Sequence, residues 1–135
     1  MTQKIAFVFP GQGSQSIGML GELAGEYPSV RQTFEEASDA LGLDLWNLVS
    51  EGPESDLNQT QNTQPALLAA GVSVWRVWEQ QGIASPVIMA GHSLGEYSAL
   101  VSAGAVEFAD GIRLVAERGR LMQEAVPEGT GAMAA

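Results

Sequence analysis

The stretch Pro86-Val87-Ile88-Met89-Ala90-Gly91-His92-Ser93-Leu94-Gly95 decides the fold. Its first half, residues 86–90, is apolar and stops at a glycine, which predicts a buried strand. A helix is expected directly afterwards, over residues 94–103. A sharp turn therefore joins strand to helix at Gly91-His92-Ser93-Leu94-Gly95, and this is the context that a G-x-S-x-G nucleophile elbow requires.

Ser93 is the candidate nucleophile because this turn exposes its hydroxyl at the carboxyl edge of the sheet. The helix N-terminus also favours negative charge there. A glycine-rich turn with a capping serine is the plainer interpretation of the same residues. His92 is the only histidine, but adjacent side chains at a tight turn point apart. We therefore expect it to pack or hydrogen-bond beneath the turn and not to act as the base.

The rest of the chain predicts an α/β fold with a parallel sheet flanked by helices. A first buried strand is expected over residues 4–9, where Pro10-Gly11 stops it. Helices are expected over residues 28–41, 63–81 and 108–126, with a shorter one over 43–49 and a polar surface connection over 51–63. Thr63 is the expected cap of the second helix, whose apolar stripe is core: Leu67, Val74, Trp75 and Trp78.

Gly11-Gln12-Gly13-Ser14-Gln15 follows the first strand and is the candidate partner loop of Ser93. Parallel strands place their carboxyl ends at one edge, so this loop is expected beside the serine. A backbone N–H of the loop and that of Leu94 can together hold a tetrahedral oxyanion. The segment fails as a dinucleotide loop because Ser16 replaces the third glycine. An ordinary glycine turn is equally compatible with the loop alone.

Arg118 stands on the apolar side of the helix expected over residues 108–126. The opposite face alternates in charge and is expected to be solvated: Arg113, Glu117, Arg120 and Glu124. The neighbours of Arg118 are instead Leu114, Val115, Leu121, Met122 and Ala125. A charge in such surroundings needs an anion, either a structural carboxylate or a substrate carboxylate gripped by two parallel hydrogen bonds.

Composition excludes several classes of function. The 135 residues carry a net charge of -10 with six basic residues, so no basic stripe for nucleic acid is present. The absence of cysteine excludes disulfides and thiolate chemistry. No segment has the length of a membrane span or of a signal-peptide core, which predicts a cytoplasmic protein. Neither a metal nor a cofactor is expected.

Four motifs together resemble the malonyl-CoA:acyl-carrier-protein transacylase family of fatty acid synthesis, over the whole chain. They are Phe7-Val8-Phe9-Pro10-Gly11-Gln12-Gly13-Ser14-Gln15, Thr63-Gln64-Pro65-Ala66, Gly91-His92-Ser93-Leu94-Gly95-Glu96, and Arg118-Gly119 with Leu121-Met122-Gln123. The resemblance implies transfer of malonyl from coenzyme A to the phosphopantetheine thiol of acyl carrier protein. Ser93 carries the acyl group, Arg118 pairs with the malonyl carboxylate, and the N–H groups of Gln12 and Leu94 hold the oxyanion. His92 and Gln64 are possible supporting residues.

The resemblance also implies a division of the chain. Residues 1–128 correspond to the N-terminal portion of an α/β-hydrolase-like acyltransferase subdomain. Residues 129–135 correspond to a linker and the start of a ferredoxin-like subdomain, so we expect a truncated product or one piece of a longer enzyme. The histidine that activates the serine in the family lies in a later part. A complementary C-terminal segment is therefore an expected partner, beside malonyl-CoA and acyl carrier protein.

Two other functions remain open at this point. An esterase or thioesterase of the α/β-hydrolase type shares the serine turn, although such folds usually place several strands before it. A non-catalytic fragment that binds coenzyme A or carrier protein is the second alternative, since this sequence shows no base for Ser93.

Overall fold

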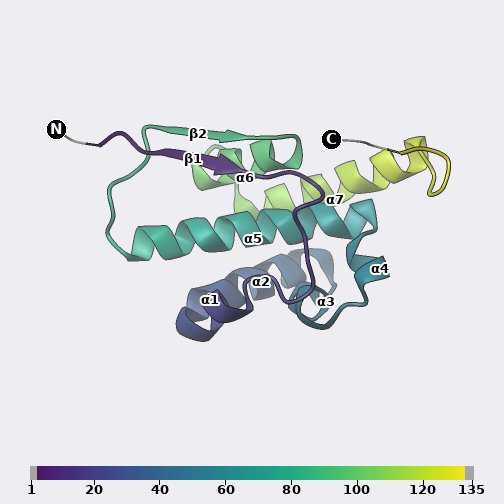
Figure 1. Cartoon of the computed structure of the whole chain (residues 1–135), viewed down its shortest axis with the longest axis horizontal. Coiled ribbons are helices and arrows are strands. Elements are labelled where there is room, and N and C mark those ends of the chain that lie inside the picture. Colours follow the sequence, from purple (N-terminus) through teal and green to yellow (C-terminus); the bar gives the residue numbers. More distant parts are fainter. Residues whose placement is uncertain (1–2, 133–135) are drawn as a thin grey trace.

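The computed structural model describes residues 3–132 and shows a small parallel sheet packed on a group of helices (Figure 1). This confirms the expected α/β class. In chain order the elements are β1 (Ala6–Phe9), α1 (Gly21–Glu26), α2 (Pro28–Leu41), α3 (Leu45–Glu51), α4 (Glu54–Leu57), α5 (Thr60–Gln80), β2 (Ile88–Gly91), α6 (Leu94–Ser102) and α7 (Phe108–Ala125). None of the helices in this described range is both long and apolar enough to span a bilayer.

The sheet consists of β1 and β2, which pair in parallel from Ala6 opposite Ile88 to Phe9 opposite Gly91. Side chains alternate between the faces of a sheet. One face carries Phe7, whose ring makes edge contacts with two tryptophans of α5, and Phe9, which is buried. The other face is exposed along its whole length, with Val8 at 77% and Ile88 at 60% exposure.

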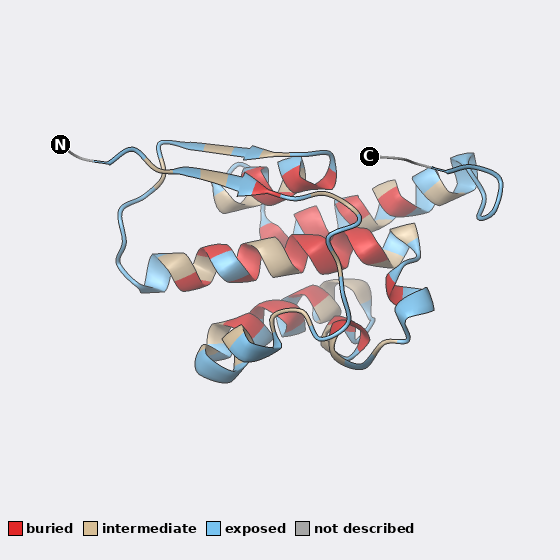
Figure 2. Cartoon of the chain, viewed as in Figure 1, coloured by how far each residue is buried: buried red, intermediate tan, exposed pale blue. Residues whose placement is uncertain are grey.

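The expectation of two buried strands is therefore wrong. Both apolar runs have the composition of strands covered on two faces, but within the described residues the helices cover only one (Figure 2). The strands are also shorter than expected, beginning at Ala6 and Ile88. The pairing continues beyond these bounds, because the N–H of Val87 donates to the carbonyl of Ile5 at 2.9 Å.

Helix α5 is the central element, and α2, α6 and α7 all pack against it (Figures 1 and 2). It begins at Thr60, not at the expected Thr63. Thr63 is not a cap but a buried residue of the first turn, whose hydroxyl lies 2.5 Å from the carbonyl oxygen of Leu57. The expected apolar stripe also needs correction at Val74, which is 41% exposed.

The region before α5 contains more helix than the sequence predicted. Residues 51–63 are not a plain surface connection, because α4 forms there and buries Leu57 completely. Helix α3 begins two residues later than expected, since the Asp44 carboxylate caps it by accepting from the N–H of Asn47 at 3.0 Å. Helix α2 runs over the expected residues 28–41.

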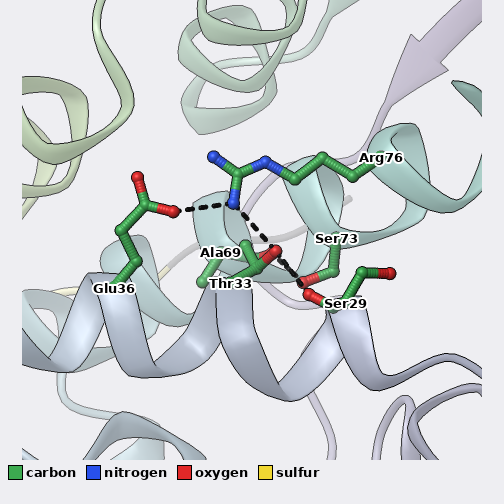
Figure 3. A network of polar contacts seen from close by, with 6 residues as sticks. All are labelled: Ser29, Thr33, Glu36, Ala69, Ser73 and Arg76. Atoms are coloured by element: carbon green, nitrogen blue, oxygen red, sulfur yellow. Dashed lines mark hydrogen bonds and ion pairs between the residues drawn. The ribbon is translucent and has the colours of Figure 1, made fainter.

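A polar network ties α2 to α5 (Figure 3). The guanidinium of Arg76 donates to the hydroxyl of Thr33 at 3.0 Å and to the carboxylate of Glu36 at 2.8 Å. The hydroxyl of Thr33 in turn donates to the carbonyl of Ser29 at 2.7 Å. The guanidinium carbon also lies over the ring of Phe108, 4.9 Å from its centre. These contacts fix the helices on which the site depends.

Candidate functional site

Ser93 occupies the turn between β2 and α6 in a strained backbone conformation. Its φ is 52° and its ψ is -112°, a combination that a residue with a Cβ rarely adopts. Such strain persists only where the surrounding structure enforces it, and it gathers at functional positions. The side chain is exposed. The turn thus holds a serine hydroxyl outside the sheet at the start of a helix, as the sequence predicted.

The glycines around Ser93 are required by close backbone contacts. A Cβ on Gly91 would lie 1.9 Å from the carbonyl carbon of Gly95, and a Cβ on Gly95 would lie 2.2 Å from the carbonyl oxygen of Phe9. No side chain fits at such distances. The missing side chains let α6 begin directly against the end of β1, which sets the sharpness of the turn.

The loop after β1 lies beside the turn, which confirms the expected proximity. A Cβ on Gly11 would lie 2.8 Å from the carbonyl oxygen of His92. The side-chain amide of Gln12 donates to the hydroxyl of Thr60 at the start of α5, at 3.1 Å. Within residues 3–132 neither the N–H of Gln12 nor that of Leu94 donates a hydrogen bond. Both donors thus lack an acceptor in this part of the chain; Gln12 is partly exposed, whereas Leu94 is fully buried.

His92 does not take the place expected for it. Its side chain is exposed and not packed beneath the turn. The ring lies against the loop after β1, with Nδ1 3.0 Å from the position of a Cβ on Gly11. The backbone of His92 does have a structural role, because its N–H donates to the carbonyl of Phe9 at 3.2 Å and extends the parallel pairing.

Arg118 reaches from α7 to the turn. One guanidinium nitrogen, Nη2, donates to Oγ of Ser93 at 3.1 Å, and the other, Nη1, donates to Oε1 of Gln64 at 3.0 Å. The guanidinium carbon lies 5.3 Å from the centre of the Tyr97 ring. Among the described residues, the ion pairs involve Arg76, Arg113 and Arg120 but not Arg118. Of the two partners that the sequence allowed, a structural carboxylate is thus not found in this part of the chain.

The other face of α7 is the solvated one that the sequence predicted. Arg120 pairs with Glu117 at 2.6 Å and also with Glu124, while Arg113 pairs with Asp110. The hydrogen bond from Arg120 lowers the pKa of Glu117 below its ordinary value. These exposed charges balance one another locally, so the positive charge of Arg118 is the one directed at the turn.

Gln64 is more than part of a helix start. It is completely buried on α5, accepts from Arg118, and donates through Nε2 to the sulfur of Met122 at 3.1 Å. The sequence did not single out Tyr97 or Thr60, which contact Arg118 and Gln12. A helical repeat places Tyr97 one turn after Ser93 and could have identified it, whereas no signal marks Thr60.

An exposed serine on a strained strand–helix turn, beside two N–H groups that have no acceptor in the described residues, defines the class of site found in serine acyltransferases and α/β-hydrolases. The sequence comparison decides between them. The family model described as "Acyl transferase domain" matches residues 6–135, and the chain belongs to this family.

Relatives with high identity carry a more specific name. Malonyl CoA-acyl carrier protein transacylases of Salmonella typhimurium and Escherichia coli are 67% and 66% identical over 135 residues. An acyl carrier protein S-malonyltransferase structure from Vibrio cholerae has a TM-score of 0.92 and 63% identity over 95% of this chain. A malonyl-transacylase in complex with a type II PKS acyl-carrier protein has a TM-score of 0.92 and 64% identity over 94%.

The chain spans less than half the length of these proteins. The matches cover 43% of the Salmonella typhimurium and Escherichia coli relatives and 42% and 41% of the two structures.

Proposed function

We propose that residues 1–135 carry the acyl-accepting part of a malonyl-CoA:acyl-carrier-protein transacylase, an acyltransferase of fatty acid biosynthesis. The observation that carries this proposal is the position of Arg118, whose guanidinium donates to Oγ of Ser93 at 3.1 Å without a carboxylate partner in the described residues. A cation at that distance from the nucleophile suits an acyl group that bears a free carboxylate.

The loading step uses three groups of the site. Oγ of Ser93 bonds to the thioester carbonyl carbon of malonyl-CoA and releases its proton to a base. The carbonyl oxygen becomes an oxyanion, which the N–H groups of Gln12 and Leu94 stabilise. The carbon–sulfur bond then breaks, and the thiolate of coenzyme A leaves with the proton from the base. Malonyl remains as an ester of Ser93, with its carboxylate on Arg118.

The second step reverses the first with a different thiol. The phosphopantetheine sulfur of acyl carrier protein attacks the ester carbonyl and gives its proton to the base. The bond to Oγ of Ser93 breaks, and the serine oxygen takes the proton back. The structure in which a relative malonyl-transacylase is bound to an acyl-carrier protein supports this choice of acceptor. A hydrolase would instead release free malonate from the same ester.

The base belongs to a part of the enzyme outside residues 1–135. His92 is the only histidine, and its ring is exposed against the loop after β1. We place residues 1–128 in the α/β-hydrolase-like subdomain and assign residues 129–135, of which 133–135 lie outside the described residues, to the linker that follows. The reaction needs no cofactor, because coenzyme A enters as part of the substrate. A cytoplasmic location agrees with this supply of substrate.

The test is the mass of the intact chain after mixing with malonyl-CoA and with the segment of the Escherichia coli relative that lies outside the match. We expect one added malonyl group, absent in Ser93→Ala and reduced at least tenfold in Arg118→Ala, which loses an ion pair worth roughly 1.5–3 kcal/mol. Arg113→Ala is the matched control, because Arg113 lies on the solvated face of the same helix and pairs with Asp110.

Two results would count against the proposal. If loading persists in Ser93→Ala, the acyl group is attached to another residue. If Arg113→Ala and Arg118→Ala reduce loading equally, Arg118 has no specific role in binding the malonyl carboxylate. Adding acyl carrier protein then distinguishes transfer from hydrolysis, because only transfer increases the mass of the carrier by the malonyl group.

A further inference from the structure

We propose that Met122 is a positioning residue, whose thioether sulfur fixes the Gln64 amide in the orientation that holds Arg118 beside Ser93. The contact between Met122 and Gln64 does not depend on any substrate. Only its predicted effect on carboxylate binding rests on the function proposed above. The proposal assigns a role to the Leu121-Met122-Gln123 motif, which the loading and transfer steps leave unused.

Because Gln64 is buried, both the oxygen and the nitrogen of its side-chain amide need hydrogen-bond partners within the protein. The residue is 0% exposed, and a buried polar group without a partner loses its hydration without compensation. Its oxygen accepts from Nη1 of Arg118 at 3.0 Å, and its nitrogen donates to the sulfur of Met122 at 3.1 Å. Within the described residues, Nε2 of Gln64 has the Met122 sulfur as its acceptor.

The chemistry of the two partners determines which way the amide points. A guanidinium has only donors, and a thioether has only a weak acceptor. A flipped Gln64 would set its NH₂ group against the guanidinium and its oxygen against the sulfur, so both hydrogen bonds would be lost together. Met122 therefore favours the same orientation of Gln64 that Arg118 requires.

The helices bring these groups into register. Arg118 and Met122 are four residues apart on α7 and so lie on one side of it, one turn from each other. Gly119 lies between them, and a Cβ there would come within 2.6 Å of the carbonyl oxygen of Thr60. The resulting close crossing of α5 and α7 inserts Gln64, one turn after Thr60, between the arginine and the methionine.

The consequence is a guanidinium that is held without being neutralised. Gln64 is uncharged, so its hydrogen bond orients Arg118 and leaves the positive charge for an incoming carboxylate. Preorganised partners of this kind reduce the ordering cost of binding. Loss of the sulfur acceptor should make the Gln64 amide more mobile. Arg118 should in consequence bind a carboxylate more weakly.

The experiment compares Met122→Leu with the unchanged chain. Leucine is of similar size but accepts no hydrogen bond. Hydrogen exchange of the Gln64 side-chain amide, followed by NMR and assigned by its loss in Gln64→Leu, is expected to accelerate roughly fivefold, the equivalent of about 1 kcal/mol. Malonate affinity should fall by a similar factor, whereas binding of malonamide, which bears no carboxylate, stays unchanged. Met19→Leu is the matched control, since Met19 packs against the hydrophobic core, whereas the hydrogen bond of the Gln64 amide goes to Met122.

A rescue variant separates positioning from packing. Met122→Gln supplies a side-chain carbonyl that can accept from Gln64, and it should restore slow exchange. Unchanged exchange in a folded Met122→Leu chain would overturn the proposal, as would faster exchange without any loss of malonate affinity. If Met122→Leu does not fold, fast exchange in a folded Met122→Gln overturns it instead. Failure of malonyl-CoA to load Ser93, with the exchange result intact, would contradict only the proposed function.

Discussion

At the scale of the residue, the backbone of Ser93 holds strain that a substitution can release. A positive φ costs a residue with a Cβ roughly 1–3 kcal/mol, whereas glycine adopts it freely. Ser93 has φ 52° and ψ -112°. The turn is therefore held in place by its neighbours, because Gly91 and Gly95 allow contacts that any side chain would prevent.

Ser93→Gly is accordingly expected to be more stable than Ser93→Ala. Both variants lose the hydroxyl and its hydrogen bond with Arg118, so their difference reports the Cβ alone. We expect about 1 kcal/mol in favour of glycine, after allowance for the entropy that glycine loses on folding. Urea unfolding of the two variants measures it. Greater stability of Ser93→Ala would mean that the turn is not strained.

Several parts of the site could be predicted from single residues. Ser93 follows from its turn, and Arg118 follows from a charge on an apolar helix face. The structure brings these two within 3.1 Å of each other. The contacts of Gln64 could not be predicted, because its partners lie 54 and 58 positions away in the sequence. His92 was expected to be packed, and its exposure depends on the path of the loop after β1.

At the scale of the element, the crossing of α5 and α7 depends on Gly119. A Cβ at this position would lie 2.6 Å from the carbonyl oxygen of Thr60 and 2.8 Å from Cα of Gln61. Both are backbone atoms, so relief requires movement of a whole helix. Because Gly119 is adjacent to Arg118, that movement also displaces the guanidinium from Ser93.

Gly119→Ala is expected to destabilise the chain by roughly 1–3 kcal/mol through overpacking. Gly25→Ala is the matched control, because it lies in helix α1 with no atom within 4 Å of an added Cβ. It should instead stabilise by roughly 0.5–1 kcal/mol, the difference in helix propensity. Thermal or urea unfolding measures both. Equal effects of the two substitutions would contradict the tight crossing.

Some of the helices could be predicted from the sequence, and others could not. Periodicity and Pro28 predicted α2 correctly, and α7 ends one residue before its expected end. The start of α5 was missed because Thr63 resembles a cap, whereas its hydroxyl is used for buried contacts with carbonyl groups. Helices α1 and α4 are too short for a periodic pattern, and α4 forms around the burial of a single leucine, Leu57.

At the scale of the whole molecule, the outer face of the sheet is an uncovered apolar surface. Four residues of its outer face are exposed, and none carries a charge: Ala6, Val8, Ile88 and Ala90. The alternating exposure along the strands could not be predicted, because the sequence of each strand is apolar on both faces. Burial of both faces needs further layers of chain, and the relatives of this protein are more than twice its length.

This outer face predicts self-association of the chain that depends on salt. Exposed apolar patches favour contact between molecules, whereas a net charge of -10 opposes it. Salt screens the repulsion and leaves the hydrophobic attraction. Sedimentation velocity should therefore show larger species as sodium chloride and protein concentration rise.

The double variant Val8→Thr with Ile88→Thr should remain monomeric under the same conditions, with a change in stability within about 0.5 kcal/mol because both side chains are exposed. The control exchanges two exposed leucines of α7 for threonine, Leu114 and Leu121, which are 49% and 51% exposed. If the molecules associate through the outer face of the sheet, the α7 control variant still associates. Loss of association in the control but not in the sheet variant would place the contact on α7, beside Arg118, where it would compete with the carboxylate.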